Sequence, residues 1–174
     1  MIKAKVQDAL NRQLNRELYS AYLYMSMSAY FESLSLKGFA SWMRVQVQEE
    51  IVHVMKFFRH LVDRGGRVIL SPVEAPPSEW SSPLNAFESA YAHEQKVTGM
   101  INDLLGLAGR EQDNATYNFL QWFVSEQVEE EASVDDVVKK LALMADAPGG
   151  LFIVDRELSQ RVFAPPPTTQ GAGA

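Results

Sequence analysis

A proline-rich segment in the middle of the chain is the feature that most limits its fold. The segment 66–82, about seventeen residues, shows no helical periodicity and includes Pro72, Pro76 and Pro77. Helical stretches flank the segment on both sides, and neither pair of helices could bury its apolar faces alone. We therefore interpret the segment as a connection within one domain and not as a linker between two domains.

Four long stretches and one short stretch of helical periodicity surround this connection. Their apolar residues recur at steps of three and four, and breaking residues separate them. Helices are expected over residues 5–33, 39–64, 83–110, 114–145 and 151–162. Ser82 and Pro83 are typical of an N-cap followed by proline in the first helical turn. Asp113 and Asn114 can cap the fourth helix in the same way.

Connection lengths predict how these helices are arranged. The first and second helices, and the third and fourth, are joined by few residues, so each pair is expected to be antiparallel. About seventeen extended residues span roughly 55 Å, whereas a helix of about twenty-six residues is roughly 40 Å long. The middle connection can therefore run the length of the bundle. The expected fold class is all-α: a four-helix bundle with one long crossover between helices two and three, plus a short C-terminal fifth helix.

Composition narrows the class of protein further. We expect one domain over residues 1–163 and a disordered tail over 164–174, which has nothing to bury. The net charge of −6 disfavours nucleic acid as a partner and suits cations. The chain has no cysteine, which excludes disulfides, iron–sulfur clusters and thiolate zinc sites. It has no apolar signal core and no apolar run of about 18 residues, so we expect a cytoplasmic protein without membrane contact.

Each of the four long helices carries a glutamate in the middle of its apolar stripe. These residues are Glu17, Glu50, Glu94 and Glu130, and the stripes contain no lysine or arginine. An ionised carboxylate in an apolar interior destabilises the fold unless it is paired. Four converging carboxylates therefore require cations between them. A pair of divalent metal ions is the simplest arrangement that satisfies all four.

A histidine on the second helix supports this interpretation. His53 follows Glu50 by three residues, which places both on one helix face, about 5–6 Å apart at Cβ. Bundles with two irons in their core use this Glu-x-x-His unit. Glu17 and Glu94 would be terminal ligands, Glu50 would bridge, and His53 and Glu130 would complete the two sites. Oxygen ligands with one imidazole favour iron or manganese over a soft metal, and leave zinc open.

Residues beside these positions each allow two interpretations. Gln127 could orient a water or bound oxygen, or could be an ordinary polar residue at a helix interface. Tyr24 could hydrogen-bond a ligand or give up an electron, or could only pack in the core. His60 and His93 are expected at the surface.

A second acidic group lies next to the predicted ligands but off the apolar stripes. Glu49, Glu126 and Glu129 could form a more exposed cluster that relays metal inward or outward. The alternative for each is a solvated charge on a helix face.

Four sequence segments carry a resemblance to a known family. They are residues 15–22 (NRELYSAY), 49–53 (EEIVH), 91–94 (YAHE) and 119–131 (FLQWFVSEQVEEE). Through these segments the chain resembles the ferritins, specifically the non-haem ferritins of bacteria and archaea, over about residues 3–162. The expected fold is thus the ferritin-like form of the four-helix bundle.

The resemblance implies two iron ions in each subunit. Glu17, Glu50 and His53 would hold the first iron. Glu50, Glu94 and Glu130 would hold the second. All five would thereby form one dinuclear ferroxidase centre.

The resemblance also implies roles around that centre. Gln127 would lie close to the two irons, and Tyr24 matches the tyrosine next to the centre. A third iron site of such proteins is matched by Glu49, Glu126 and Glu129 together with Glu130, which is also a ligand of the second iron.

Family members form a hollow shell of twenty-four copies, oxidise Fe(II) with oxygen or peroxide, and store a ferric mineral inside. The resemblance therefore implies a homo-oligomeric ferroxidase that stores and detoxifies iron.

Bacterioferritins carry a histidine at the position of Glu130 and a haem methionine near Val52; neither is present, which disfavours haem. The alternatives are a di-iron oxidase acting on an organic substrate and a non-catalytic helical-bundle interaction protein.

Overall fold

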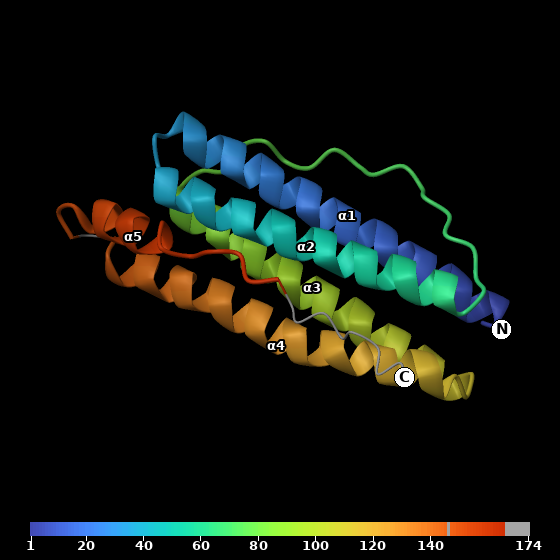
Figure 1. Cartoon of the computed structure of the whole chain (residues 1–174). Coiled ribbons are helices and arrows are strands. Elements are labelled where there is room, and N and C mark those ends of the chain that lie inside the picture. The colour runs from blue at the N-terminus through green and yellow to red at the C-terminus, as the bar shows by residue number, and fades with distance from the viewer. Residues whose placement is uncertain (146, 166–174) are drawn as a thin grey trace, which may run out of the picture.

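The computed structural model describes residues 1–145 and 147–165, and its regular elements are helices. The helices are α1 (Ala4–Ser33), α2 (Lys37–Asp63), α3 (Pro83–Arg110), α4 (Asn114–Leu143) and α5 (Gly150–Leu158). The four long helices lie side by side and α5 packs at one end of them, which confirms the predicted fold class (Figure 1). Within the described ranges, none of the helices has the length and apolar character needed to cross a membrane. Residues 166–174, most of the tail expected to be disordered, lie outside the described part.

Polar side chains set the starts of α3 and α4 as the sequence predicts. Ser82 Oγ accepts a hydrogen bond from the N–H three residues later (3.1 Å), and Pro83 occupies the first turn. Asp113 Oδ1 accepts from the N–H of Thr116 (3.1 Å). Each bond satisfies a donor that a helix start leaves without a partner. Asp113 also binds Arg64 at the end of α2 (2.8 Å), which ties the two helix pairs together.

The crossover between α2 and α3 runs along α1 for most of the length of the bundle (Figure 1). An extended chain must find partners for its backbone polar groups, and side chains of α1 provide several of them. These contacts join Asn11 to Arg67 (3.0 Å) and Ile69 (2.8 Å), Asn15 to Ser71 and Pro72 (both 3.2 Å), Ser26 to Pro77 (2.6 Å) and Tyr30 to Trp80 (2.9 Å). The crossover returns the chain to the end where α2 begins, so α2 and α3 are parallel.

The buried apolar side chains form two halves along the bundle. One half surrounds the aromatic rings of Phe31, Phe39 and Phe87, at the end that α5 covers. The other half surrounds Phe57 and Phe123, whose ring centroids lie 4.4 Å apart. On every long helix, the glutamate in the apolar stripe falls between the residues of the two halves. The two halves therefore enclose a polar layer in the middle of the bundle.

The short helix α5 is fixed to the start of α2. Asp155 Oδ1 accepts hydrogen bonds from the N–H groups of Gly38 (2.7 Å) and Phe39 (3.1 Å), which are donors of the first turn of α2. Gly38 is required there, because a Cβ at that position would lie 1.6 Å from the carbonyl oxygen of Asp155. The expected extension of α5 to Val162 is wrong: the helix ends at Leu158.

The segment after α5 leaves the helix and runs back toward the middle of the bundle (Figure 1). Arg161 in this segment forms an ion pair with Glu49 of α2 (2.7 Å). Helical periodicity cannot reveal such a contact, because the two residues are 112 positions apart in the chain.

Candidate metal centre

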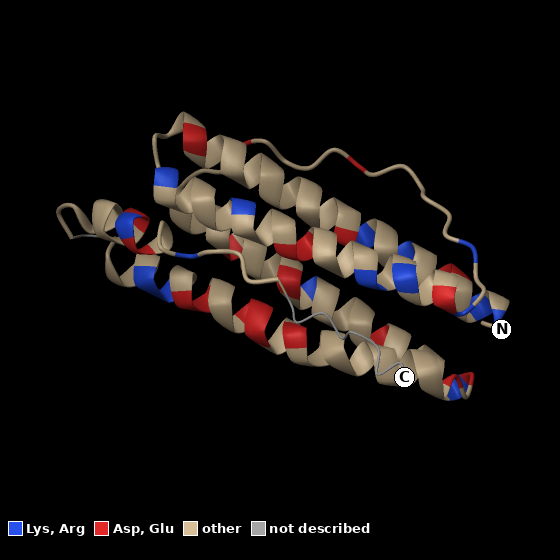
Figure 2. Cartoon of the chain, viewed as in Figure 1, with Lys and Arg blue, Asp and Glu red and all other residues tan. Residues whose placement is uncertain are grey.

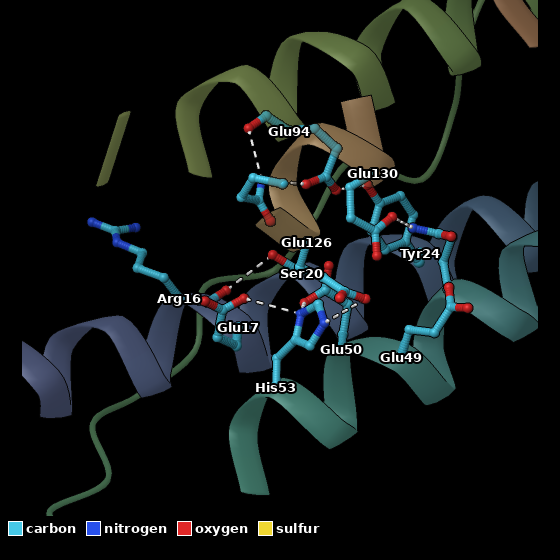
Figure 3. Close-up of polar contacts among 12 residues, drawn as sticks. Arg16, Glu17, Ser20, Tyr24, Glu49, Glu50, His53, Glu94, Glu126 and Glu130 are labelled. Carbon is cyan, nitrogen blue, oxygen red and sulfur yellow. Dashed lines mark hydrogen bonds and ion pairs between the residues drawn. The ribbon is translucent and has the colours of Figure 1, made fainter. Parts of the chain in front are cut away.

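The five predicted ligands come together in the polar layer of the bundle (Figure 3). They are Glu17 from α1, Glu50 and His53 from α2, Glu94 from α3 and Glu130 from α4, and each is at most 4% exposed. Helical geometry causes this convergence, since each residue lies on the buried stripe of its own helix.

Three of these side chains form one compact group. His53 Nδ1 lies 3.2 Å from Glu50 Oε2 and 3.9 Å from Glu17 Oε2. One donor atom from each residue lies within 4.8 Å of the other two. First-row divalent ions bind such donors at about 2.0–2.2 Å, so small side-chain movements would let all three contact one ion.

A second group of donors contains Glu130. Its donor atom lies within 4.8 Å of donor atoms of His53 and Glu126. His53 thus has carboxylates on both ring nitrogens, because its Nε2 is 3.9 Å from Glu126 Oε1. Glu94 is close enough to Glu130 for the charge of Glu130 to raise the pKa of Glu94.

Neutral hydrogen-bond donors hold the carboxylates at the ends of the cluster. The donor pairs are Gln13 with Glu17 (2.8 Å), Gln46 with Glu130 (2.8 Å), Gln127 with Glu94 (3.2 Å) and Tyr24 with Glu94. Glu50, the predicted bridge, is instead contacted by His53. A neutral donor orients a carboxylate and leaves its charge available for a cation. The carboxylates are thus oriented and remain available to bind cations.

Sequence reasoning missed Gln13 and Gln46, which are 3% and 0% exposed. Both lie one position before an apolar residue of the stripe, Leu14 and Val47, so the steps of three and four that define each stripe leave them out. A signal was present: each lies four residues before a predicted ligand, hence one turn away on the same face.

Burial shifts the proton affinity of the cluster. It raises the pKa of Glu17 and Glu94 to about 8, and neighbouring carboxylates add to both shifts. Burial also raises the pKa of Glu50 to about 7, against the effect of His53. For His53, burial lowers the pKa, but Glu126 and Glu50 more than offset this and raise it well above its usual value. Without a cation, the carboxyls of Glu17 and Glu94 retain protons near neutral pH.

Only one of the three more exposed acidic residues lies in a group of candidate metal donors. Glu126 joins His53 and Glu130, and its side chain is 28% exposed. Glu49 is paired with Arg161. Glu129 is exposed and belongs to neither of the two groups of donor atoms.

Two histidines expected at the surface are half-buried instead. His60 stacks on Phe119, with ring centroids 4.0 Å apart. His93 Nε2 lies 2.8 Å from Ser20 Oγ, and burial lowers the pKa of His93 to about 4. The prediction was wrong because neighbouring helices cover the edges of the apolar stripes as well as their centres.

The architecture and the cluster define a class of protein. A four-helix bundle with one long crossover, enclosing buried carboxylates and a single imidazole between two apolar halves, is the framework of ferritin-like carboxylate bundles.

The chain belongs to the ferritin family. The family model of the ferritin-like domain matches residues 7–144. The bacterial non-heme ferritin of Bacteroides fragilis is 41% identical over 161 residues, which cover 92% of this chain and 100% of the relative. That of Escherichia coli O6:H1 is 42% identical over 159 residues, which cover 91% and 96%. The resemblance of the sequence to the non-haem ferritins is thereby confirmed.

Solved structures agree with this assignment. An open-pore ferritin from the hyperthermophilic archaeon Archaeoglobus fulgidus superposes with a TM-score of 0.92 at 57% identity, covering 93% of this chain and 100% of that chain. An engineered closed form of the same ferritin gives a TM-score of 0.93, also at 57% identity, covering 94% and 100%. Family membership supports iron binding and a homo-oligomeric state.

Proposed function

We propose that the chain is a ferroxidase subunit of an iron-storage protein. It oxidises Fe(II) to Fe(III) with O₂ or peroxide and deposits ferric oxyhydroxide inside a hollow shell. The observation that carries this proposal is the buried cluster of four glutamates and one histidine in a ferritin fold. Buried carboxylates at this density need cations, and the family supports iron as the cation.

Two Fe(II) ions are the substrates of the dinuclear centre in this proposal. Glu17 and His53 hold the first ion, Glu94 and Glu130 hold the second, and Glu50 bridges them. The contacts of His53 with Glu17 and Glu50 support the first site. The pair of Fe(II) ions gives two electrons to O₂ or to peroxide, and hydrolysis of the ferric product releases protons. The protein holds the two ions at a fixed separation and supplies the negative charge of the carboxylates around them.

Two neighbours position this centre. Gln127 donates to Glu94 and to Thr98 Oγ1 (both 3.2 Å), which fixes its amide beside the second iron. Tyr24 is fully buried and donates to the other oxygen of Glu94. We assign Tyr24 to orientation of that carboxylate, with electron donation as its second candidate role.

A third, weaker iron site is proposed at the acidic cluster formed by Glu49, Glu126, Glu129 and Glu130. The proximity of Glu126, Glu130 and His53 supports the inner part of this site. The outer part, Glu49 and Glu129, rests on the resemblance to non-haem ferritins.

The proposed assembly is a shell of twenty-four copies without haem, in the cytoplasm. Exposed apolar side chains on α5 support burial against other copies: Leu151 is 40%, Phe152 70% and Ile153 54% exposed. The absence of cysteine fits a reducing compartment.

The test is oxygen consumption after Fe(II) is added to the metal-free protein, compared with a Glu50→Ala, His53→Ala variant. We expect the initial rate to fall by at least about a hundredfold in the variant, because it removes the bridge and the imidazole. Equal initial rates would contradict the site assignment. Particle mass adds a second check: a monomer of 19.5 kDa would contradict the shell, whereas several hundred kDa would support it.

A further inference from the structure

The segment after α5 reaches the outer acidic cluster from outside the four long helices. Residues 159–165 run back over α2, where acidic positions of α2 and α4 lie near the middle of the bundle (Figure 2). Arg161 Nη2 lies 2.7 Å from Glu49 Oε2, with the two side chains 23% and 21% exposed. The Arg161 guanidinium also lies over the ring of Trp42, at 4.3 Å from its centroid. Arg161 thus places a positive charge on one carboxylate of the proposed third site.

The same segment closes one side of a small cavity beside the centre. Phe163 and Ala164 line this cavity together with Glu49, His53 and Glu126, and its volume is about 230 Å³. The cavity connects residues of the outer acidic cluster with the histidine of the inner cluster. Access to this space therefore depends on where the segment lies.

Two buried polar atoms beside the cluster have no hydrogen-bond partner. They are Gln46 Oε1 and Arg161 Nη1, the two such side-chain atoms found across residues 1–145 and 147–165. Gln46 contacts Glu130 through its nitrogen, and Arg161 contacts Glu49. Gln46 Oε1 is a hydrogen-bond acceptor and Arg161 Nη1 is a donor, so each atom could form one further hydrogen bond. A hydrated cation in the cluster would supply a water donor to Gln46, and release of Arg161 would return its guanidinium to water.

The anchoring of α5 confines any movement to the segment beyond it. Asp155 binds the first turn of α2, and Glu157 pairs with Lys140 of α4 (2.5 Å). Beyond Leu158, Arg161 provides the polar contact that ties the described segment to the bundle. Loss of this ion pair would remove the charged contact of the segment without detaching α5, and would leave the contacts of the segment with Trp42 and with the cavity lining.

We propose that Arg161 competes with iron for Glu49, so that an incoming cation at the third site must displace the guanidinium. This inference rests on the third site of the proposed function. Arg161 is a positioning residue, because it acts on iron through Glu49. It keeps the outer site weak, and the outer cluster then fills only after the buried centre.

Calorimetric titration without oxygen tests this competition on the assembled, metal-free protein. Fe(II) is titrated into the unmodified protein and into Arg161→Gln, with Zn²⁺ as a redox-inert second probe. We expect the third ion to bind about tenfold more tightly in Arg161→Gln, equivalent to ~1.4 kcal/mol. The factor is modest because a partly exposed ion pair is screened by water. Arg161→Lys keeps the charge but loses the planar group that lies over Trp42, so its affinity for the third ion should fall between those of the unmodified protein and Arg161→Gln.

The decisive control makes the Arg161→Gln substitution in a protein that already lacks the Glu49 carboxylate. In a Glu49→Gln background, Arg161→Gln should leave the affinity for the remaining ions unchanged. An unchanged third affinity in Arg161→Gln alone, or an equal gain in both backgrounds, would overturn the competition. If neither protein binds more than two ions per chain, the third site fails as well. Light scattering first establishes that all variants assemble to the same mass.

Discussion

The raised pKa values in the cluster predict that iron binding releases protons in a pH-dependent number. Below its pKa of about 8, the carboxyl of Glu17 or Glu94 is largely protonated, and Glu50 changes state at about 7. At pH 7 a group with a pKa of about 8 is protonated in roughly nine molecules of ten, and a group with a pKa of about 7 in half. Two Fe(II) ions would therefore displace roughly two protons from these carboxyls.

The histidine adds to this release. The pKa of His53 is also raised, so the imidazole must lose a proton before it can bind iron. The total at pH 7 therefore exceeds the carboxyl share of roughly two protons per chain, and that share falls to roughly 0.2 at pH 9. Because bound protons compete with iron, affinity rises with pH. The apparent binding constant should increase at least about a hundredfold per pH unit below pH 7, and the increase should become smaller between pH 8 and pH 9 as the carboxyl share falls.

The assay is calorimetric titration of the metal-free protein with Fe(II), without oxygen, in buffers of different ionisation enthalpy. The dependence of the observed heat on that enthalpy gives the number of protons released. Glu17→Gln should lower the release at pH 7 by about one proton. Glu88→Gln, at an exposed position on α3, is the matched control and should leave it unchanged. A release below about one proton at pH 7, or the same release at pH 7 and pH 9, would refute the reasoning.

Two further predictions concern the support of the centre and of α5. Gln46→Leu removes the amide that orients Glu130 and should weaken binding of the second iron about tenfold; anaerobic titration measures this, and unchanged affinity would exclude the orienting role. Asp155→Ala removes the acceptor for the N–H groups of Gly38 and Phe39 and should lower stability by ~1–2 kcal/mol, seen as a lower melting temperature. Asp155→Asn keeps a hydrogen-bond acceptor and should lower the stability by less than Asp155→Ala does.

Local patterns in the sequence determined the helices, their order and the identity of the buried carboxylates. Periodicity and caps gave bounds close to those observed for the long helices, since a helix start depends on a few adjacent residues such as Ser82 and Pro83. The glutamate in each apolar stripe was equally visible, because one helix face carries one row of side chains. The single domain over residues 1–163 stays a prediction, as do the ligand roles.

Only the tertiary structure decided which groups surround those carboxylates. Gln46 reaches Glu130 across 84 positions of the chain, and Arg161 reaches Glu49 across 112. Such pairs follow no local period, because they depend on how helices pack and where α5 ends. The sequence by itself determined a carboxylate-rich bundle of the ferritin type. Packing decided that neutral amides orient the inner carboxylates and that an arginine from beyond α5 occupies the outer cluster.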